Sequence, residues 1–329
     1  MVSPSPGPDD RWQVLIYHPE ADVYRDAVEQ QLAAEPTLAA RVALTTARSR
    51  DEAAARIADA DALLTSGLLE ASYLRRARRL RWIQTTSAGV EGLLRPGVLP
   101  AGVRLARLTG SFGPRMAEYV AAYMLAATQR LPAVLAQQSQ RLWRPFEPGV
   151  LAGRLAGVAG LGSIGRAVVA KLVALGLRVR GCSRTRPRDL PLEAWFDPEQ
   201  RAAFVSGCDF VVLCLPETPQ TRDFMGPAEL TAMKPDAWLI NIGRGSALDE
   251  EALVAALRAG RLGGAVLDVF RQEPLAPDSP LWDAPNLIIT PHISGVTLPD
   301  EAASAFLANF RRLLAGEPLL DEVDPARGY

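Results

Sequence analysis

Residues 157–165 read GVAGLGSIG, an apolar run that leads into three glycines spaced as G-x-G-x-x-G. At the end of a strand, the first two glycines allow a tight turn and a close approach of the backbone to a pyrophosphate, and the third lets a helix pack closely. A helix starting at about Ser163 would offer free N–H groups and a positive dipole end to the phosphates. We predict that a dinucleotide contacts Gly160, Leu161, Gly162, Ser163, Ile164 and Gly165, the alternative being a glycine-rich turn without a ligand.

Short apolar segments alternate with amphipathic helical segments on both sides of this motif. Strands separated by helices favour parallel sheets that are covered on both faces. We therefore predict an α/β fold of two units, the second of which binds the dinucleotide. The expected strands are 12–17, 42–46, 62–65 and 82–85 in the first unit and 177–182, 210–215, 238–242, 265–269 and 287–290 in the second, and the expected helices include 22–34, 163–175 and 299–314.

The composition excludes several classes of partner. The formal net charge of the 329 residues is −1, so no global positive field would gather nucleic acid or anionic lipid. No stretch approaches the roughly 20 apolar residues that span a bilayer, and residues 1–11 lack the apolar core of a signal peptide. Cys182, Cys208 and Cys214 show neither metal-ligand spacing nor an even disulfide count. We expect a cytoplasmic protein with no metal site and no nucleic-acid or membrane partner.

Residues 114–130 read PRMAEYVAAYMLAATQR and form a predicted helix that is apolar around nearly its whole circumference. Such a helix must be covered on all sides. One interpretation is a central core helix. The other is that one face packs against a second subunit, which would make the protein a homodimer.

The turn after strand 177–182 indicates which dinucleotide is preferred. An acidic residue that holds the ribose 2′-hydroxyl of NAD is expected about 20 residues after the glycine motif. No Asp or Glu lies between Gly165 and Asp189, and the turn instead contains Ser183, Arg184, Thr185 and Arg186. Guanidinium groups match the oxygens of a 2′-phosphate, so we predict NADP(H) as the preferred cofactor and NAD(H) as the alternative.

Three ionisable residues each follow a predicted strand: Arg244, Glu273 and His292. Open α/β sheets bind ligands at the carboxyl ends of their strands. Reduction of an anionic keto acid needs a cation for the carboxylate and the ketone, a group that titrates near neutrality, and a carboxylate to orient that group. Taken singly, Arg244 and Glu273 are also compatible with surface ion pairs and His292 with a loop histidine, so the spacing alone does not decide.

His18 is the other histidine of the chain and ends the first predicted strand, in Tyr17-His18-Pro19. At this position its ring would either face the substrate or belong to an ordinary surface loop. The loop interpretation is the simpler one, and we retain both.

The motifs GLGSIG, LPETPQT, INIGRGSALDEEAL, GAVLDVFRQEPL and LIITPHISG, with TSAGVEGLL and AEY before them, occur in one order along the chain. This set resembles the D-isomer-specific 2-hydroxyacid dehydrogenase family, most closely its NADPH-dependent glyoxylate/hydroxypyruvate reductases. The resemblance implies that His292 is the general acid/base, Glu273 its partner and Arg244 the substrate-binding arginine. It further implies cofactor contacts at Leu215, Pro216, Ile242, Gly243, Asp268, His292 and Gly295, and binding of the substrate carboxylate by the backbone of Ser87, Ala88 and Gly89.

The family architecture implies two domains of Rossmann-like and flavodoxin-like type with the active site in the cleft between them. Residues 1–104 and 297–329 would form the substrate domain and residues 105–296 the dinucleotide-binding domain. Glu273 replaces the glutamine of the family's formate dehydrogenases, and the chain ends soon after helix 299–314, which argues against the regulatory domain of some phosphoglycerate dehydrogenases.

Two other functions share these motifs. A non-catalytic NAD(P)(H) sensor resembling the carboxy-terminal-binding corepressors would bind the same cofactor without turnover. An enzyme acting on phosphite or another inorganic acid would share the cofactor chemistry but not the specificity for keto acids. The resemblance favours reduction of a small 2-keto acid to the D-2-hydroxy acid.

Overall fold

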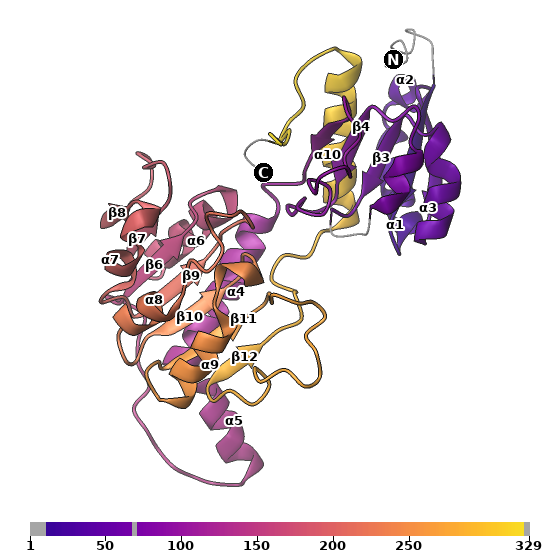
Figure 1. Cartoon of the computed structure of the whole chain (residues 1–329). Helices are drawn as coiled ribbons and strands as arrows, with labels where there is room; N and C mark the ends of the chain where they lie inside the picture. The colour runs from indigo at the N-terminus through magenta and orange to yellow at the C-terminus, as the bar shows by residue number, and fades with distance from the viewer. Residues whose placement is uncertain (1–10, 68–70, 326–329) are drawn as a thin grey trace. The chain divides into compact units, whose positions relative to one another are not determined.

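The structure is a computed structural model that describes residues 11–67 and 71–325. The chain divides into two compact units (Figure 1). The first contains the described residues up to Ser111 and those from Thr297 onwards, and the second is Phe112–Val296. The chain therefore leaves the first unit and returns to it near its carboxyl end.

The first unit is built on a parallel sheet of five strands in the order β2-β1-β3-β4-β5. The strands are β1 (Trp12–Tyr17), β2 (Val42–Ala47), β3 (Ala62–Thr65), β4 (Trp82–Thr85) and β5 (Arg104–Ala106). The helices are α1 (Ala21–Leu32), α2 (Pro36–Ala39), α3 (Arg50–Arg56) and α10 (Pro299–Leu314), with short 3-10 turns η1 (Ile57–Asp59) and η2 (Ser72–Arg76).

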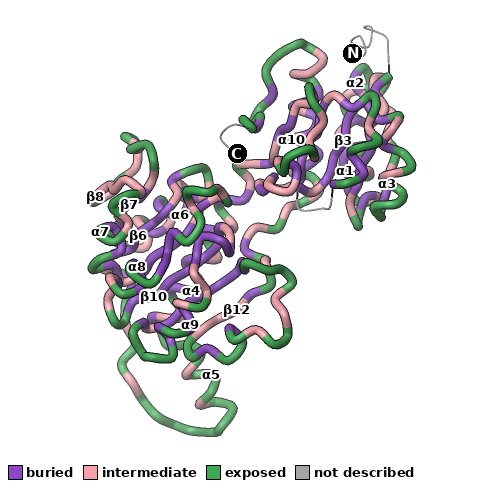
Figure 2. Tube along the Cα trace, viewed as in Figure 1, coloured by how far each residue is buried: buried purple, intermediate pink, exposed green. Residues whose placement is uncertain are grey.

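Successive residues of β1 face two different cores, as the two-residue period of a strand requires. Val14 and Ile16 pack with α1 and α10, whereas Leu15 and Tyr17 pack with residues of α3 and η2. Because both faces are covered by helices, the strand reads as continuously apolar from Val14 to Tyr17. Strands β3 and β4 are buried along their whole length, and β3 is drawn in the buried colour in Figure 2.

The second unit contains a parallel sheet of seven strands in the order β12-β11-β10-β9-β6-β7-β8. The strands are β6 (Leu155–Ala159), β7 (Arg178–Cys182), β8 (Ala194–Phe196), β9 (Phe210–Leu213), β10 (Trp238–Asn241), β11 (Gly264–Leu267) and β12 (Leu287–Ile289). The helices are α4 (Phe112–Thr128), α5 (Leu131–Ser139), α6 (Ser163–Ala174), α7 (Arg201–Val205), α8 (Pro227–Ala232) and α9 (Glu250–Arg258), with η3 (Pro198–Gln200) and η4 (Gly245–Ala247).

Helix α4 is a core helix along much of its length. It packs against α6 and buries Phe112, Met116, Val120 and Met124. On another part of its surface, Leu125 is exposed. The core interpretation of the apolar 114–130 segment therefore holds for the face that contacts α6.

The prediction of an α/β fold with parallel sheets is confirmed. The predicted strand 210–215 is two residues too long, because the backbone of Cys214 and Leu215 has left the sheet and packs against Gly160 and Gly243. Within the described ranges, no helix combines the length and apolar character needed to cross a membrane.

Candidate functional site

The predicted cofactor and catalytic residues of the second unit follow the carboxyl ends of six adjacent parallel strands. In sheet order, the segments come after β12, β11, β10, β9, β6 and β7. His292 and Gly295 follow β12, Asp268 and Glu273 follow β11, and Ile242, Gly243 and Arg244 follow β10. Leu215 and Pro216 follow β9, residues 160–165 follow β6, and residues 183–186 follow β7. The fold thus gathers residues 135 positions apart in the sequence at one edge of a sheet.

His292 and Glu273 are in direct contact, with 2.7 Å between His292 Nδ1 and Glu273 Oε2. The second carboxylate oxygen, Oε1, accepts a hydrogen bond from the N–H of Phe270 at 2.9 Å. Because a carboxylate only accepts, the imidazole donates from Nδ1 and its Nε2 is left for other chemistry. About a third of each side chain is exposed.

The electrostatic setting of Glu273 keeps it ionised. Partial burial alone would raise the pKa of Glu273, but the hydrogen bonds from His292 and from the N–H of Phe270 lower it, as do the charges of His292 and Arg244. The net result is a pKa below the ordinary value. A carboxylate that remains charged throughout the titration range of an imidazole favours the imidazolium form of its neighbour.

Two close backbone contacts fix the position of Arg244. A Cβ on Gly243 would lie 2.6 Å from the backbone of Leu215, and a Cβ on Gly245 would lie 1.9 Å from the carbonyl carbon of Phe270. The chain around Arg244 is therefore held between the segments that follow β9 and β11. Its Nη1 donates to the Gly243 carbonyl at 2.8 Å. Arg244 acts on Glu273 as a positive charge, so the structure brings Arg244, Glu273 and His292 together.

Asp268 is fully buried, and its carboxylate organises the loop that carries His292. Oδ1 accepts from Thr290 Oγ1 at 2.5 Å and from the N–H of Ile293 at 2.8 Å, and Oδ2 accepts from the N–H of Ser294 at 2.8 Å. The bonds from the loop fill three of about four acceptor positions of a carboxylate.

The glycine motif has the geometry that a pyrophosphate requires. A Cβ on Gly165 would lie 1.8 Å from the carbonyl oxygen of Gly160, whereas the space beside Gly162 is open. Gly162 precedes α6 and no side chain caps the helix, so the first N–H groups of α6 are available to a ligand. These features fit a bound dinucleotide at the amino end of α6.

The turn after β7 exposes Arg184, Thr185 and Arg186. Ser183 is partly buried; its hydroxyl donates to the Thr185 carbonyl at 2.8 Å and accepts from Trp195 Nε1 at 3.1 Å. The serine shapes the turn, and the arginines are the groups accessible to a phosphate.

In the first unit, Ser87 links two loops at the carboxyl ends of β3 and β4. Its hydroxyl accepts from the N–H of Gly67 and donates to the carbonyl of Gly89, both at 3.0 Å. The Ser87 side chain is thus already engaged, while Ala88 is partly buried and Gly89 is buried. Because the serine hydroxyl is engaged, the binding of a carboxylate by the backbone of residues 87–89 stays a prediction.

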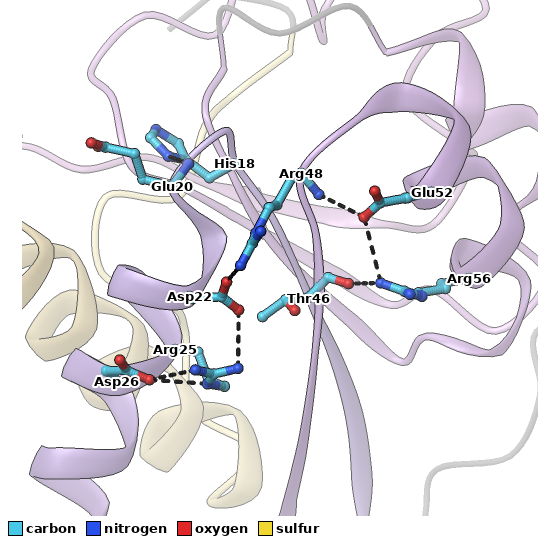
Figure 3. A network of polar contacts seen from close by, with 9 residues as sticks. All are labelled: His18, Glu20, Asp22, Arg25, Asp26, Thr46, Arg48, Glu52 and Arg56. Carbon is cyan, nitrogen blue, oxygen red and sulfur yellow. Dashed lines mark hydrogen bonds and ion pairs between the residues drawn. The ribbon is translucent and has the colours of Figure 1, made fainter.

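His18 supports the start of α1. Its Nδ1 accepts the N–H of Glu20 at 3.1 Å, and burial lowers the pKa of His18 despite the opposing charge of Glu20. Figure 3 shows this contact beside a surface network in which Asp22 pairs with Arg25 and Arg48. The observed contact is a structural one, and a role toward substrate stays a prediction.

Three residues that contribute to the site were not among the predicted site residues. Thr290 and Tyr119 extend the hydrogen bonds of Asp268. Arg271 donates to the Leu248 carbonyl and pairs with Asp223, which braces the segment that contains Glu273. Among the described residues, no group of His, Cys, Asp and Glu side chains has the arrangement of a metal site.

Comparisons with known proteins give consistent results. The family model for the D-isomer specific 2-hydroxyacid dehydrogenase NAD binding domain matches residues 121–294. A glyoxylate/hydroxypyruvate reductase A of Yersinia enterocolitica is 38% identical over 256 residues, covering 76% of this chain and 82% of the relative. A D-isomer specific 2-hydroxyacid dehydrogenase from Xanthobacter autotrophicus, solved with NADPH and MES, has a TM-score of 0.84 and 33% identity over 97% of this chain and 100% of its own. An NADPH-dependent glyoxylate/hydroxypyruvate reductase from Sinorhizobium meliloti, solved with NADP and sulfate, has a TM-score of 0.84 and 28% identity with the same coverage.

Proposed function

Because the chain belongs to the D-isomer specific 2-hydroxyacid dehydrogenase family, we propose that it reduces a small 2-keto acid of the glyoxylate or hydroxypyruvate type to the D-2-hydroxy acid. The observation that carries the proposal is the 2.7 Å contact between His292 and Glu273 at the sheet edge that also holds Arg244. The printed names of the related reductases support this substrate class and an NADPH cofactor.

The residues around the glycine motif would hold the cofactor. The N–H groups at the start of α6 would bind its phosphates, and Arg184 with Arg186 would bind a 2′-phosphate. Leu215, Pro216, Ile242 and Gly243, with Asp268 and Gly295, would line the nicotinamide half. When bound, the nicotinamide supplies the hydride that adds to C2 of the keto acid.

The chain's own groups account for the rest of the reaction. Arg244 binds the substrate carboxylate, and its charge polarises the ketone. The carboxylate contact expected for the backbone of residues 87–89 stays a prediction. His292 donates a proton from Nε2 to the ketone oxygen as that oxygen becomes an alcohol. Glu273 holds the ring through Nδ1 and stabilises the charged imidazolium before the transfer.

A panel of candidate substrates tests this proposal. The protein is mixed with NADPH and, in separate reactions, glyoxylate, hydroxypyruvate, pyruvate and bulkier 2-keto acids, and loss of NADPH absorbance is followed. We expect turnover with at least one small keto acid. A protein that binds NADPH tightly but oxidises it with none of these keto acids would instead be a dinucleotide sensor. A protein that is inactive with all the keto acids but reduces NADP with phosphite would act on an inorganic acid.

We also propose that the protein is a homodimer whose subunits contact each other through the exposed apolar residues of α5 and the segment after it. No residue of α5 is buried, although Leu131, Val134 and Leu135 lie on it, and Trp143 beyond it is 95% exposed. A contiguous exposed apolar surface is typical of a protein–protein contact. The cytoplasmic location expected from the sequence stays a prediction.

A further inference from the structure

The loop that carries His292 has an unusual backbone. His292 adopts φ 54°, in the left-handed region that non-glycine residues rarely occupy. Such a conformation costs free energy and persists only when surrounding contacts enforce it. The contacts that enforce it here come from Asp268, which binds the loop on both sides of the histidine.

Asp268 receives one donor from the amino-terminal side of His292 and two from the carboxyl-terminal side. The Thr290 hydroxyl lies two residues before the histidine, and the N–H groups of Ile293 and Ser294 follow it. The N–H of His292 itself donates to the carbonyl oxygen of Asp268 at 3.0 Å. Asp268, Thr290 and Ser294 are all buried, so water does not compete for these bonds.

A further hydrogen bond continues this arrangement to helix α4. Tyr119 Oη lies 2.6 Å from Thr290 Oγ1. The one hydroxyl hydrogen of Thr290 is donated to Asp268 Oδ1. Tyr119 must therefore donate to Thr290, which gives a directed chain from Tyr119 to Thr290 to the Asp268 carboxylate. Hydrogen bonds in such a chain polarise and strengthen one another.

We infer that Thr290 and Tyr119 are positioning residues that set the orientation of His292 through the carboxylate of Asp268. The expected loss of kcat rests on the proposed function. The expected change in the orientation of His292 does not depend on any substrate. Thr290 fixes the carboxylate from one side of the loop, and Tyr119 fixes Thr290 from a core helix. The His292–Glu273 contact orients the imidazole ring, and this chain orients the backbone that bears the ring.

The test uses Thr290→Val, which keeps the shape of the side chain and removes the hydroxyl, and Thr290→Ser, which restores the hydroxyl. Tyr119→Phe removes the donor at the other end of the chain. Each full-length variant is compared with wild type for kcat, KM, NADPH Kd and the NMR signal of histidine labelled with ¹³C in the ring. The chain has only two histidines, so His18, in the first unit, is an internal control.

We expect Thr290→Val to lower kcat about ten- to a hundredfold, because misplacement of a catalytic group by about 1 Å has an effect of that size. The His292 signal should shift or broaden in Thr290→Val and Tyr119→Phe, the His18 signal should not, and Thr290→Ser should restore both kcat and the His292 signal. If Thr290→Val does not fold, Tyr119→Phe and Thr290→Ser provide the same comparison.

An unchanged His292 signal in Thr290→Val and Tyr119→Phe would overturn the inference, as would failure of Thr290→Ser to restore it. If the wild type reduces no keto acid but the His292 signal responds as expected, the positioning chain stands and the proposed function fails. If the wild type is active but the variants retain kcat within about twofold and an unchanged His292 signal, the proposed function stands and the positioning chain fails.

Discussion

His292 and Glu273 divide two tasks between the two nitrogens of one imidazole ring. Nδ1 is held by the carboxylate, so the ring has a fixed orientation and a defined proton position. Under the proposed function, Nε2 is the nitrogen that would exchange a proton with substrate. Glu273 in turn accepts a hydrogen bond from the N–H of Phe270, so the backbone fixes the position of the His292–Glu273 pair.

Removing the imidazole should lower the rate of the chemical step and leave cofactor binding nearly unchanged. Positioned proton transfer contributes roughly 10²- to 10⁴-fold to rate, so we expect His292→Ala to lower kcat by that factor. NADPH Kd, measured by fluorescence, should change little. His18→Ala is the matched control, because the His18 ring contacts the N–H of Glu20 and the ring of Tyr24, just before and within α1. Equal losses of kcat in the two variants would contradict the role of His292.

The charge of Glu273 should be visible in the pH dependence of keto-acid reduction. Under the proposed function, reduction requires a protonated His292, so the rate should fall as pH rises, and the Glu273 carboxylate should move that fall to higher pH. Because the pKa of Glu273 is below its ordinary value, wild-type Glu273 is charged over this whole range. In Glu273→Gln the falling limb should move to lower pH, because the neutral amide no longer favours the imidazolium form of His292. An unmoved limb would refute the coupling.

In the turn between β6 and α6, Gly165 is required for helix packing, whereas Gly162 is expected to be required for cofactor binding. A Cβ on Gly165 would strike the Gly160 carbonyl, so Gly165→Ala should displace α6 and destabilise the protein by about 1–3 kcal/mol. Gly162→Ala meets open space, so its Tm should be unchanged while NADPH binding weakens. Thermal unfolding and an NADPH titration check both variants. If Gly162→Ala binds NADPH as tightly as wild type, the pyrophosphate does not bind at this turn.

The turn after β7 should select the dinucleotide. Arg184→Ala removes a charged donor, and a charged hydrogen bond of about 1.5–3 kcal/mol corresponds to roughly a ten- to hundredfold increase in the NADPH Kd. NADH Kd should not change, because NADH lacks the 2′-phosphate. Arg178→Ala is the matched control, since Arg178 lies at the amino end of the same strand and pairs with Glu193. Equal effects on both dinucleotides would contradict the predicted contact.

Elements with strong local patterns were predictable from sequence. The bounds of β1, β3, β4 and α10 agree with the predicted ranges, and the family predicted from the ordered motifs is confirmed. The edge strands β5 and β8 were not predicted. Each has three residues, too few for a period to be recognised, and each is defined by pairing with a neighbouring strand.

The candidate site was predictable where a residue type and its strand position together imply chemistry. Arg244, Glu273 and His292 belong to that group, and the structure brings them together. Thr290 and Tyr119 do not, because a hydroxyl just after a strand or within a helix has many ordinary functions. Their importance depends on a buried acceptor 22 residues from Thr290 and a contact 171 residues away in sequence, which only the fold creates.

At the scale of the whole molecule, the exposed apolar side chains of α5 predict a dimer. Light scattering should give twice the chain mass of 35.4 kDa. Leu135→Asp, at a residue 56% exposed on α5, should yield monomers by placing a charge in the contact. Val23→Asp is the control, because Val23 is similarly exposed, at 51%, on α1 of the other unit. A wild-type monomer at micromolar concentration would contradict the assembly.

If Arg244 holds the substrate carboxylate while His292 supplies the proton, the whole protein should reduce only ketones that carry a neighbouring carboxylate. The most direct measurement compares kcat/KM for NADPH oxidation with hydroxypyruvate and with hydroxyacetone, in which a methyl group replaces the carboxylate. We predict turnover of hydroxypyruvate and a preference of at least about 10⁴-fold, because a site built to bind a polar group rejects an analogue that lacks it. Equal rates with both ketones, or no NADPH oxidation with hydroxypyruvate or any other small 2-keto acid, would contradict the account.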